Sequence, residues 1–192
     1  NNRIATCFFG DGAVDQGALH ETMNIAQLWK LPVIFVVENN GYSMGTAVRR
    51  HTVNEIVDRA KGYGMKSALL NGMEVFTVYE QMKKIADDVR KNQEPYFVEI
   101  RTYRYRGHSM SDPQKYRTKD ELEEYKKIDP VERLKTYILD KKVATEDQIK
   151  EIIDRIDEEV MEAVNFADEA PQPPLSDLTE HVFVEDGYPF HT

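Results

Sequence analysis

Ile4-Ala5-Thr6-Cys7-Phe8-Phe9-Gly10-Asp11-Gly12 is an apolar run of strand length that ends in a Gly-Asp-Gly turn. Val33-Ile34-Phe35-Val36-Val37-Glu38 is a second such run, and it ends at Asn39-Asn40. Between the two runs, residues 14–30 carry apolar side chains at helical spacing, and Pro32 marks the break. Continuous apolar strands joined by a helix are typical of a parallel sheet that is buried on both faces.

The polar residues that follow these two strands predict a ligand site. In a right-handed crossover both strands end at the same edge of the sheet, so we expect Asp11 and Asn40 at the edge where open α/β sheets bind ligands. Carboxylate and amide oxygens, completed by phosphates and water, suit Mg²⁺. Gly10 and Gly12 permit close approach of the backbone to a ligand, and a helix that begins near Ala13 would direct free N–H groups at a phosphate.

These residues predict a metal-bridged diphosphate site. The alternative interpretation is an ordinary glycine-rich turn followed by a polar Asn-Asn-Gly turn. Pairing of the two turns across a single crossover favours the site. A nucleotide-binding module that uses the same glycines is disfavoured, because the chain lacks the Gly-x-Gly-x-x-Gly spacing and a P-loop lysine.

The rest of the chain completes a doubly wound α/β fold with a mainly parallel sheet. Further strands are predicted over 66–71 and 96–101, with an amphipathic helix over 75–90. Thr118-Lys119-Asp120-Glu121 is a capping box that begins a charged helix, and a longer helix begins at Thr145-Glu146-Asp147-Gln148. We therefore expect an α/β part over 1–117, a helical extension over 118–170, and a Pro-rich linker and tail over 171–192.

Composition excludes several classes of protein. The chain has 192 residues, a hydrophobic fraction of 41% and a net charge of −9, which argues against a general binder of nucleic acid or anionic membranes. Its single cysteine, Cys7, is expected to be a buried small hydrophobe, so neither a disulfide framework nor a cysteine metal cluster is predicted. No apolar run approaches membrane-spanning length, and no signal peptide is visible.

Two further segments carry candidate site residues. The loop over 41–52 follows Asn40 directly and should line a ligand, whereas His51 within it is interpreted as a surface histidine. Residues 101–108 place Arg104 and His108 in a cluster of basic and tyrosine side chains at the end of the 96–101 strand. Such donors suit a diphosphate or a 2-oxo acid carboxylate, and the alternative is a solvated basic loop.

Gly10-Asp11-Gly12, separated by twenty-six residues from Asn39-Asn40, resembles the signature of thiamine-diphosphate-dependent enzymes. Longer segments resemble the alpha subunit of the pyruvate dehydrogenase decarboxylase component, in the 2-oxo acid dehydrogenase family. The resemblance covers nearly all of the chain and is strongest over 8–48 and 99–131. The segments that carry it include Leu28-Trp29-Lys30-Leu31-Pro32, Glu38-Asn39-Asn40-Gly41-Tyr42-Ser43-Met44-Gly45-Thr46 and Tyr103-Arg104-Tyr105-Arg106-Gly107-His108-Ser109-Met110-Ser111-Asp112-Pro113.

The resemblance implies thiamine diphosphate and Mg²⁺ as cofactors. It would make Asp11, Asn40 and the backbone carbonyl of Tyr42 the Mg²⁺ ligands, with the turn Gly10-Asp11-Gly12-Ala13 beside the diphosphate. Met44 is a candidate for packing against the thiazolium ring, and the alternative is a gap-filling side chain. His108 would reach the diphosphate and the reaction centre and contribute to acyl transfer, and Arg104 would order the loop.

Ser109 matches the principal serine that is phosphorylated in mitochondrial relatives, where a phosphate would disorder the loop. Two other switch hydroxyls are absent, because this chain has Ala47 at one position and reads Gln114-Lys115 before Tyr116 at the other. This difference from the mitochondrial relatives favours an unregulated, bacterial and cytoplasmic enzyme. A eukaryotic enzyme would belong in the mitochondrial matrix. Ser109 would then only hydrogen-bond within its loop.

The activity implied by the resemblance is conversion of pyruvate, a product of glycolysis, toward acetyl-CoA. The enzyme decarboxylates pyruvate and reductively acetylates a lipoyl group on an acyltransferase core, and it needs a beta subunit, in an α2β2 heterotetramer, for the other half of the site. Such alpha subunits are longer, so we expect a C-terminal part whose N-terminal portion is absent. Acetoin or branched-chain 2-oxo acid dehydrogenase, or a catalytically inert scaffold of the same fold, are the alternatives.

Overall fold

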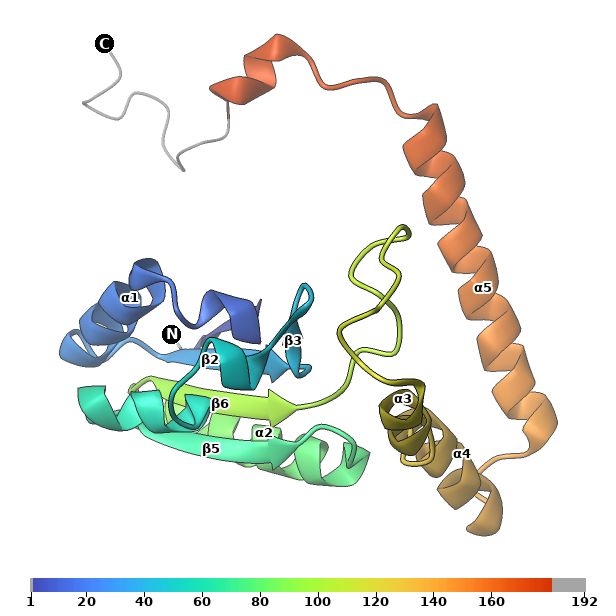
Figure 1. The fold of residues 1–192 in the computed structure, drawn as a ribbon, viewed down its shortest axis with the longest axis horizontal. Coiled ribbons are helices and arrows are strands. Elements are labelled where there is room, and N and C mark those ends of the chain that lie inside the picture. Colours follow the sequence, from blue (N-terminus) through green and yellow to red (C-terminus); the bar gives the residue numbers. More distant parts are fainter. Residues whose placement is uncertain (1, 181–192) are drawn as a thin grey trace. The chain divides into compact units, whose positions relative to one another are not determined.

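The computed structural model describes residues 2–180 (Figure 1). The first part of the chain forms a four-stranded sheet in which all neighbouring strands are parallel. In spatial order the strands are β1 (Ala5–Gly10), β2 (Val33–Asn39), β6 (Tyr96–Arg101) and β5 (Lys66–Asn71). The four strands predicted from sequence are thus present, and the predicted mainly parallel α/β architecture is confirmed. Residues 181–192 of the predicted tail lie outside the described residues.

Helices cover both faces of this sheet. Alternate side chains of β2 point to opposite faces: Phe35 and Val37 join one core cluster, and Ile34 and Val36 join the other. The first cluster includes Met23 of α1 (Gly17–Leu28) and residues of the 3₁₀ helix η3 (Ile56–Tyr63). The second cluster includes residues of α2 (Val75–Asn92). The central strands are therefore buried on both faces, as their continuous apolar sequences predict.

β1 departs from that expectation. It lies at one edge of the sheet, where β2 is its one neighbour among the described strands. Phe9 packs against the first core cluster, but Cys7 is exposed and Phe8 is 61% exposed. The prediction of a buried Cys7 is wrong, because strand length and apolar composition do not specify whether a strand is central or at an edge.

Short elements occupy the carboxyl edge of the sheet. Residues Asp11–Ala13 form a 3₁₀ turn, η1, and α1 begins only at Gly17. The prediction of a helix start near Ala13 is therefore wrong by one turn; Val14 N–H bonds to the Asp11 carbonyl, and the Val14 side chain is buried in the core. After β2, the chain forms a small antiparallel pair, β3 (Tyr42–Ser43) and β4 (Thr46–Ala47), followed by η2 (Val48–Arg50).

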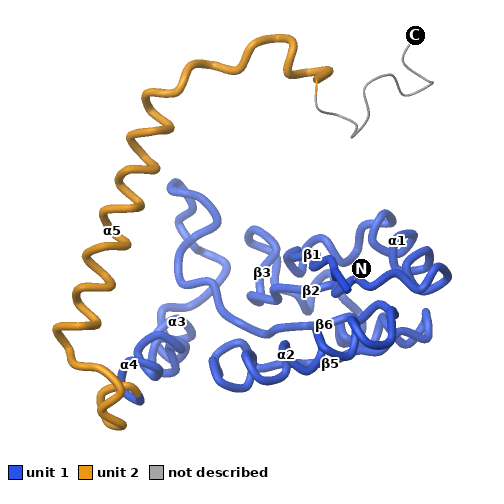
Figure 2. The backbone as a smooth tube through the Cα atoms, turned by 180° about the vertical axis from the view of Figure 1, so that it is seen from behind, with its two compact units in different colours: residues 1–137 blue, residues 138–192 orange. Residues whose placement is uncertain are grey.

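Helices follow the basic loop after β6. They are α3 (Lys119–Lys126), α4 (Pro130–Asp140), α5 (Glu146–Glu169) and a short 3₁₀ helix η4 (Leu175–Leu178). Thr145 and Gln148 form a reciprocal capping box at the start of α5, where a helix start was predicted. The chain divides into two compact units, Asn1–Tyr137 and Ile138–Thr192 (Figure 2), with the boundary inside α4. None of the described helices is long and apolar enough to cross a membrane.

Candidate functional site

Asp11 lies directly after β1, at the carboxyl edge of the sheet. Its side chain is only 1% exposed, and its Oδ2 atom has no hydrogen-bond partner among the described residues. A buried carboxylate oxygen without a partner is uncommon, because removing charge from water is costly unless a partner compensates. Asp11 is therefore a candidate to bind a positively charged group.

His51 faces this carboxylate, although the sequence suggested a surface histidine. Its side chain is 19% exposed, and its Nε2 atom lies 3.7 Å from Asp11 Oδ2. Its Nδ1 atom lies 2.7 Å from Asp15 Oδ2, and Arg59 forms an ion pair with the other oxygen of Asp15. Burial raises the pKa of Asp15, but hydrogen bonds from Arg59 and His51 outweigh it and hold that pKa below its ordinary value.

Gly12 lies against the loop that follows β2. A Cβ atom on Gly12 would lie 2.8 Å from Ser43 Cβ, which is closer than real Cβ atoms approach one another. The crowding at Gly12 is with β3 of the same chain, whereas the predicted close approach of this turn to a ligand stays a prediction. No such crowding exists at Gly10, where nothing lies within 4 Å of a Cβ atom. The contact at Gly12 brings the turn after β1 next to the loop after β2.

Asn40 and Tyr42 form a local turn at that edge. Asn40 Oδ1 accepts a 3.2 Å hydrogen bond from Tyr42 N–H, and the Tyr42 carbonyl accepts a 3.3 Å hydrogen bond from Arg104 Nη1. Each oxygen has a second lone pair and can accept another partner. Met44 is 63% exposed and takes a left-handed φ of 52°. Its side chain is thus at the surface of this chain and does not fill a gap in the core.

Arg104 joins the basic loop to the loop after β2. Besides the Tyr42 carbonyl, its guanidinium reaches the Met44 carbonyl at 2.6 Å and the Tyr116 hydroxyl at 3.0 Å. Arg117 in turn binds the carbonyls of Arg104 and Tyr105. The two arginines therefore hold these loops through main-chain oxygens. The hydrogen bonds of the Arg104 guanidinium fix the positions of the loops in this chain.

His108 and Ser109 lie exposed in the basic loop. Asp112 organises this segment: its oxygens accept hydrogen bonds from the His108 and Gln114 amides, each at 2.8 Å, and from the Tyr116 hydroxyl at 2.7 Å. Within the described residues the His108 imidazole has no hydrogen-bond partner, and it is not brought into contact with Asp11. The Ser109 hydroxyl lies 3.2 Å from that of Ser111, which is a bond within the loop.

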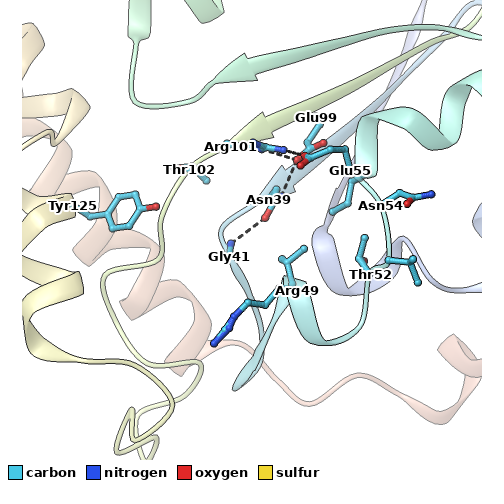
Figure 3. A pocket seen from close by; sticks show the side chains of 13 residues that line it. Asn39, Gly41, Arg49, Thr52, Asn54, Glu55, Glu99, Arg101, Thr102 and Tyr125 are labelled. Atoms are coloured by element: carbon cyan, nitrogen blue, oxygen red, sulfur yellow. Dashed lines mark hydrogen bonds and ion pairs between the residues drawn. The ribbon is translucent and has the colours of Figure 1, made fainter.

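A pocket of about 420 Å³ lies at the ends of β2 and β6 (Figure 3). Glu99 is fully buried at its wall and accepts 2.8 Å hydrogen bonds from Asn39 Nδ2 and from Val57 N–H. Arg101 lies 3.0 Å from the same carboxylate and also pairs with Glu55. These partners satisfy the buried Glu99 carboxylate, which in turn holds the ends of β2 and β6 and the start of η3 together.

Sequence reasoning missed several residues of this region. His51, Asp15 and Arg59 became connected only through folding, because Asp15 lies far from the other two in the sequence and Arg59 belongs to η3. Glu121 was assigned to a reciprocal capping box; Thr118 does cap the Glu121 amide, but the Glu121 carboxylate accepts from Tyr42 at 2.7 Å. The one local signal for the group of His51, Asp15 and Arg59 is the presence of Asp15 four residues after Asp11 in the sequence.

The donor set around Asp11 fits a cation that is completed by other ligands. Among residues 2–180, no group of three or more His, Cys, Asp or Glu side chains is arranged to hold a metal ion. A cation here would therefore depend on Asp11, on amide and main-chain oxygens, and on ligands outside the protein such as phosphates, as Mg²⁺ commonly does. The Asp11 oxygen that lacks a hydrogen-bond partner among the described residues is the feature that favours such a cation.

The sequence profile of the dehydrogenase E1 component family matches residues 1–176. The chain belongs to this E1 family. The E1 chain is 45% identical over 184 residues to the pyruvate dehydrogenase E1 component subunit alpha of Rickettsia bellii, over 95% of this chain and 56% of the relative. Identity to the corresponding Rhizobium meliloti subunit is 41% over 180 residues, or 93% of this chain and 52% of that one.

A chloroplastic relative is similar to the same extent. Pyruvate dehydrogenase E1 component subunit alpha-3, chloroplastic, of Oryza sativa is 44% identical over 181 residues, over 94% of the E1 chain and 43% of the relative. The E1 chain thus spans about half the length of the curated relatives it matches. A transketolase structure from Pichia stipitis has a TM-score of 0.45 and 21% identity, covering 52% of this chain and 15% of that one.

Proposed function

We propose that this E1 chain is the part of a pyruvate dehydrogenase alpha subunit that holds Mg²⁺ and the diphosphate of thiamine diphosphate. The observation that carries the proposal is the buried Asp11 carboxylate, one oxygen of which lacks a hydrogen-bond partner among the described residues, at the carboxyl edge of a parallel sheet in an E1 chain. The names of the relatives favour pyruvate over branched-chain 2-oxo acids and acetoin. The fold is then that of thiamine-diphosphate-binding domains, with α3 to α5 as its helical extension.

In this proposal Asp11, Asn40 and the Tyr42 carbonyl bind Mg²⁺, and the backbone of Gly10, Gly12 and Ala13 lies beside the diphosphate. Thiamine diphosphate, when bound, supplies the carbon that attacks the keto group of pyruvate and holds the electrons left by the departing CO₂. Met44, which is exposed in this chain, offers an apolar surface for the cofactor ring.

His108 has the catalytic role in this proposal, and Arg104 a positioning role. The exposed His108 imidazole can donate to a substrate or phosphate oxygen, because no protein group occupies it among the described residues. Arg104 fixes the two loops on which His108 and the Tyr42 carbonyl lie. Ser109, exposed beside His108, is the position at which a phosphate would bring negative charge next to the imidazole.

The proposed partners follow from the same assignment. A beta subunit, in an α2β2 assembly, completes the site, and a lipoyl-bearing acyltransferase receives the acetyl group. Bacterial relatives favour a cytoplasmic enzyme; a rice relative is named chloroplastic. The proposed functional division is an α/β site part over 1–117, a helical extension over 118–170 and a tail over 171–192.

The test uses the full-length alpha subunit co-expressed with its beta partner. Reduction of an artificial electron acceptor is measured with pyruvate, branched-chain 2-oxo acids and acetoin, with and without thiamine diphosphate and Mg²⁺. We expect pyruvate-dependent turnover that disappears in Asp11→Ala and persists in Asp58→Ala, whose carboxylate forms an exposed pair with Lys61. Preference for acetoin or branched acids would change the substrate and keep the mechanism, whereas absence of both turnover and cofactor binding would leave an inert scaffold.

A further inference from the structure

A buried carboxylate at the ends of β2 and β6 receives hydrogen bonds from three segments of the chain. Glu99 of β6 is fully buried, and its Oε1 atom accepts from Asn39 Nδ2 at 2.8 Å and from Arg101 Nε at 3.0 Å (Figure 3). Its Oε2 atom accepts from Val57 N–H at 2.8 Å. A guanidinium and a main-chain N–H group can only donate, so both Glu99 oxygens act as acceptors. Glu99 therefore presents an acceptor to the Asn39 side chain.

This acceptor determines the orientation of the Asn39 amide. An amide group has an oxygen that accepts and an NH₂ group that donates, and a half-turn of the group exchanges them. Because the Glu99 oxygen accepts, the NH₂ group of Asn39 faces Glu99 and the Asn39 oxygen faces the other way. That oxygen accepts a 3.1 Å hydrogen bond from Gly41 N–H. With the opposite orientation, the NH₂ group would face Gly41 N–H and this bond would be lost.

The hydrogen bond between Gly41 and Asn39 closes a turn around Asn40. Gly41 has a left-handed φ of 87°, and its carbonyl accepts from Val48 N–H at 3.1 Å. Tyr42 follows directly, and its N–H donates to Asn40 Oδ1 at 3.2 Å. The Asn40 side chain and the Tyr42 carbonyl supply the oxygens that the proposed function assigns to Mg²⁺. The turn that Asn39 closes therefore sets the backbone that carries both oxygens.

We propose that Glu99 is a positioning residue for the cation site and acts through the Asn39 amide. Its carboxylate keeps the turn closed, and the closed turn holds Asn40 and the Tyr42 carbonyl in place for the cation. The inference rests on the proposed function, which makes these two groups metal ligands. Residues that orient metal ligands without touching the metal commonly change metal affinity by about 10–100-fold when they are replaced.

The experiment compares two replacements of Glu99 in the full-length subunit assembled with its beta partner. Glu99→Met removes both acceptor oxygens, whereas Glu99→Gln keeps one. We expect the remaining oxygen to face Asn39 and Arg101, because this orientation leaves only Val57 N–H without its acceptor. Asn39→Ala removes the hydrogen bond that closes the turn and leaves Glu99 with its other two donors.

Two quantities are measured without substrate. The affinity for Mn²⁺, the probe, is measured by EPR of the free ion with thiamine diphosphate present, and hydrogen exchange of residues 39–44 is measured in the metal-free protein. Glu99→Met and Asn39→Ala should each weaken Mn²⁺ binding by about tenfold and accelerate exchange. The double variant should lose no more than about twofold beyond Asn39→Ala, because both changes open the same turn. Glu99→Gln should stay within about threefold of the wild-type affinity, although it denatures at a lower temperature.

Additive losses of Mn²⁺ affinity in the double variant, or equal losses in Glu99→Gln and Glu99→Met, would show that Glu99 only supports the fold and would overturn the inference. Wild-type Mn²⁺ affinity in Asn39→Ala would overturn it even if Glu99→Met does not assemble. The proposed function is tested separately, because it requires Asp11→Ala to abolish Mn²⁺ binding whatever the result at Glu99.

Discussion

The Tyr42 hydroxyl donates a 2.7 Å hydrogen bond to Glu121 Oε1 and thereby ties the loop after β2 to α3. Tyr103, at the start of the basic loop, donates to the same oxygen at 2.9 Å and stacks on Tyr125 with ring centroids 3.8 Å apart. Burial, followed by the Glu121 hydrogen bond, raises the pKa of Tyr42 to about 12. One carboxylate of α3 thus holds both loops that carry candidate site residues.

Removing this shared acceptor should destabilise the subunit. Glu121→Ala leaves two part-buried hydroxyls without their acceptor, and we expect the free energy of unfolding to fall by about 1–3 kcal/mol. Urea denaturation of the full-length subunit measures the change. Glu123→Ala is the matched control, because its exposed pair with Lys126 should contribute less than about 0.5 kcal/mol. Equal losses in both variants would contradict the anchoring role of Glu121.

Arg104→Lys should loosen the loop over 42–47. A single ammonium group cannot reproduce the forked contacts of the guanidinium with the Tyr42 and Met44 carbonyls and the Tyr116 hydroxyl. Hydrogen exchange of the 42–47 amides should accelerate about tenfold, which corresponds to roughly 1.4 kcal/mol of local stability. Arg106→Lys, at an exposed neighbouring position, should leave exchange unchanged. Unaltered protection in Arg104→Lys would show that the loop is held without Arg104.

Gly12→Ala should destabilise the turn after β1, because the added methyl group would collide with Ser43 Cβ at 2.8 Å. Overpacking of this kind costs about 1–3 kcal/mol. The double variant Gly12→Ala with Ser43→Gly removes the collision and should recover most of the loss in thermal denaturation. Gly10→Ala is the control, since nothing lies within 4 Å of its Cβ position. No recovery in the double variant would place the strain elsewhere.

Because of Asp112, the stability of the basic loop should decrease at acid pH. Hydrogen bonds from the Tyr116 hydroxyl, and then from the His108 and Gln114 amides, lower the pKa of Asp112 from 3.8 to about 2. Because the folded pKa is the lower one, the stabilisation of the loop is present above about pH 4 and is lost as the pH falls toward about 2. Carboxyl ¹³C NMR should detect this pKa and its rise toward 3.8 in Tyr116→Phe. A pKa near 3.8 in the wild type would refute the arrangement.

Much of the fold follows from local sequence. Continuous apolar runs predicted β1 and β2, and the handedness of the crossover placed Asp11 and Asn40 at one edge, which the parallel register of Gly10 with Glu38 confirms. The stretch Thr145-Glu146-Asp147-Gln148 predicted the start of α5, where Thr145 and Gln148 form a capping box within four consecutive residues. Each of these signals depends on neighbours in the chain.

The tertiary structure decided what depends on distant neighbours. It inserted β6 between β2 and β5, left Cys7 exposed on an edge strand, and turned His51 toward Asp11, 40 residues away in the chain. It also directed Glu121 to Tyr42 and not to its own helix start. Apolar periodicity and helix capping are local properties that a sequence specifies, whereas strand order, exposure and the pairing of buried charges are set by whichever segments the fold packs together.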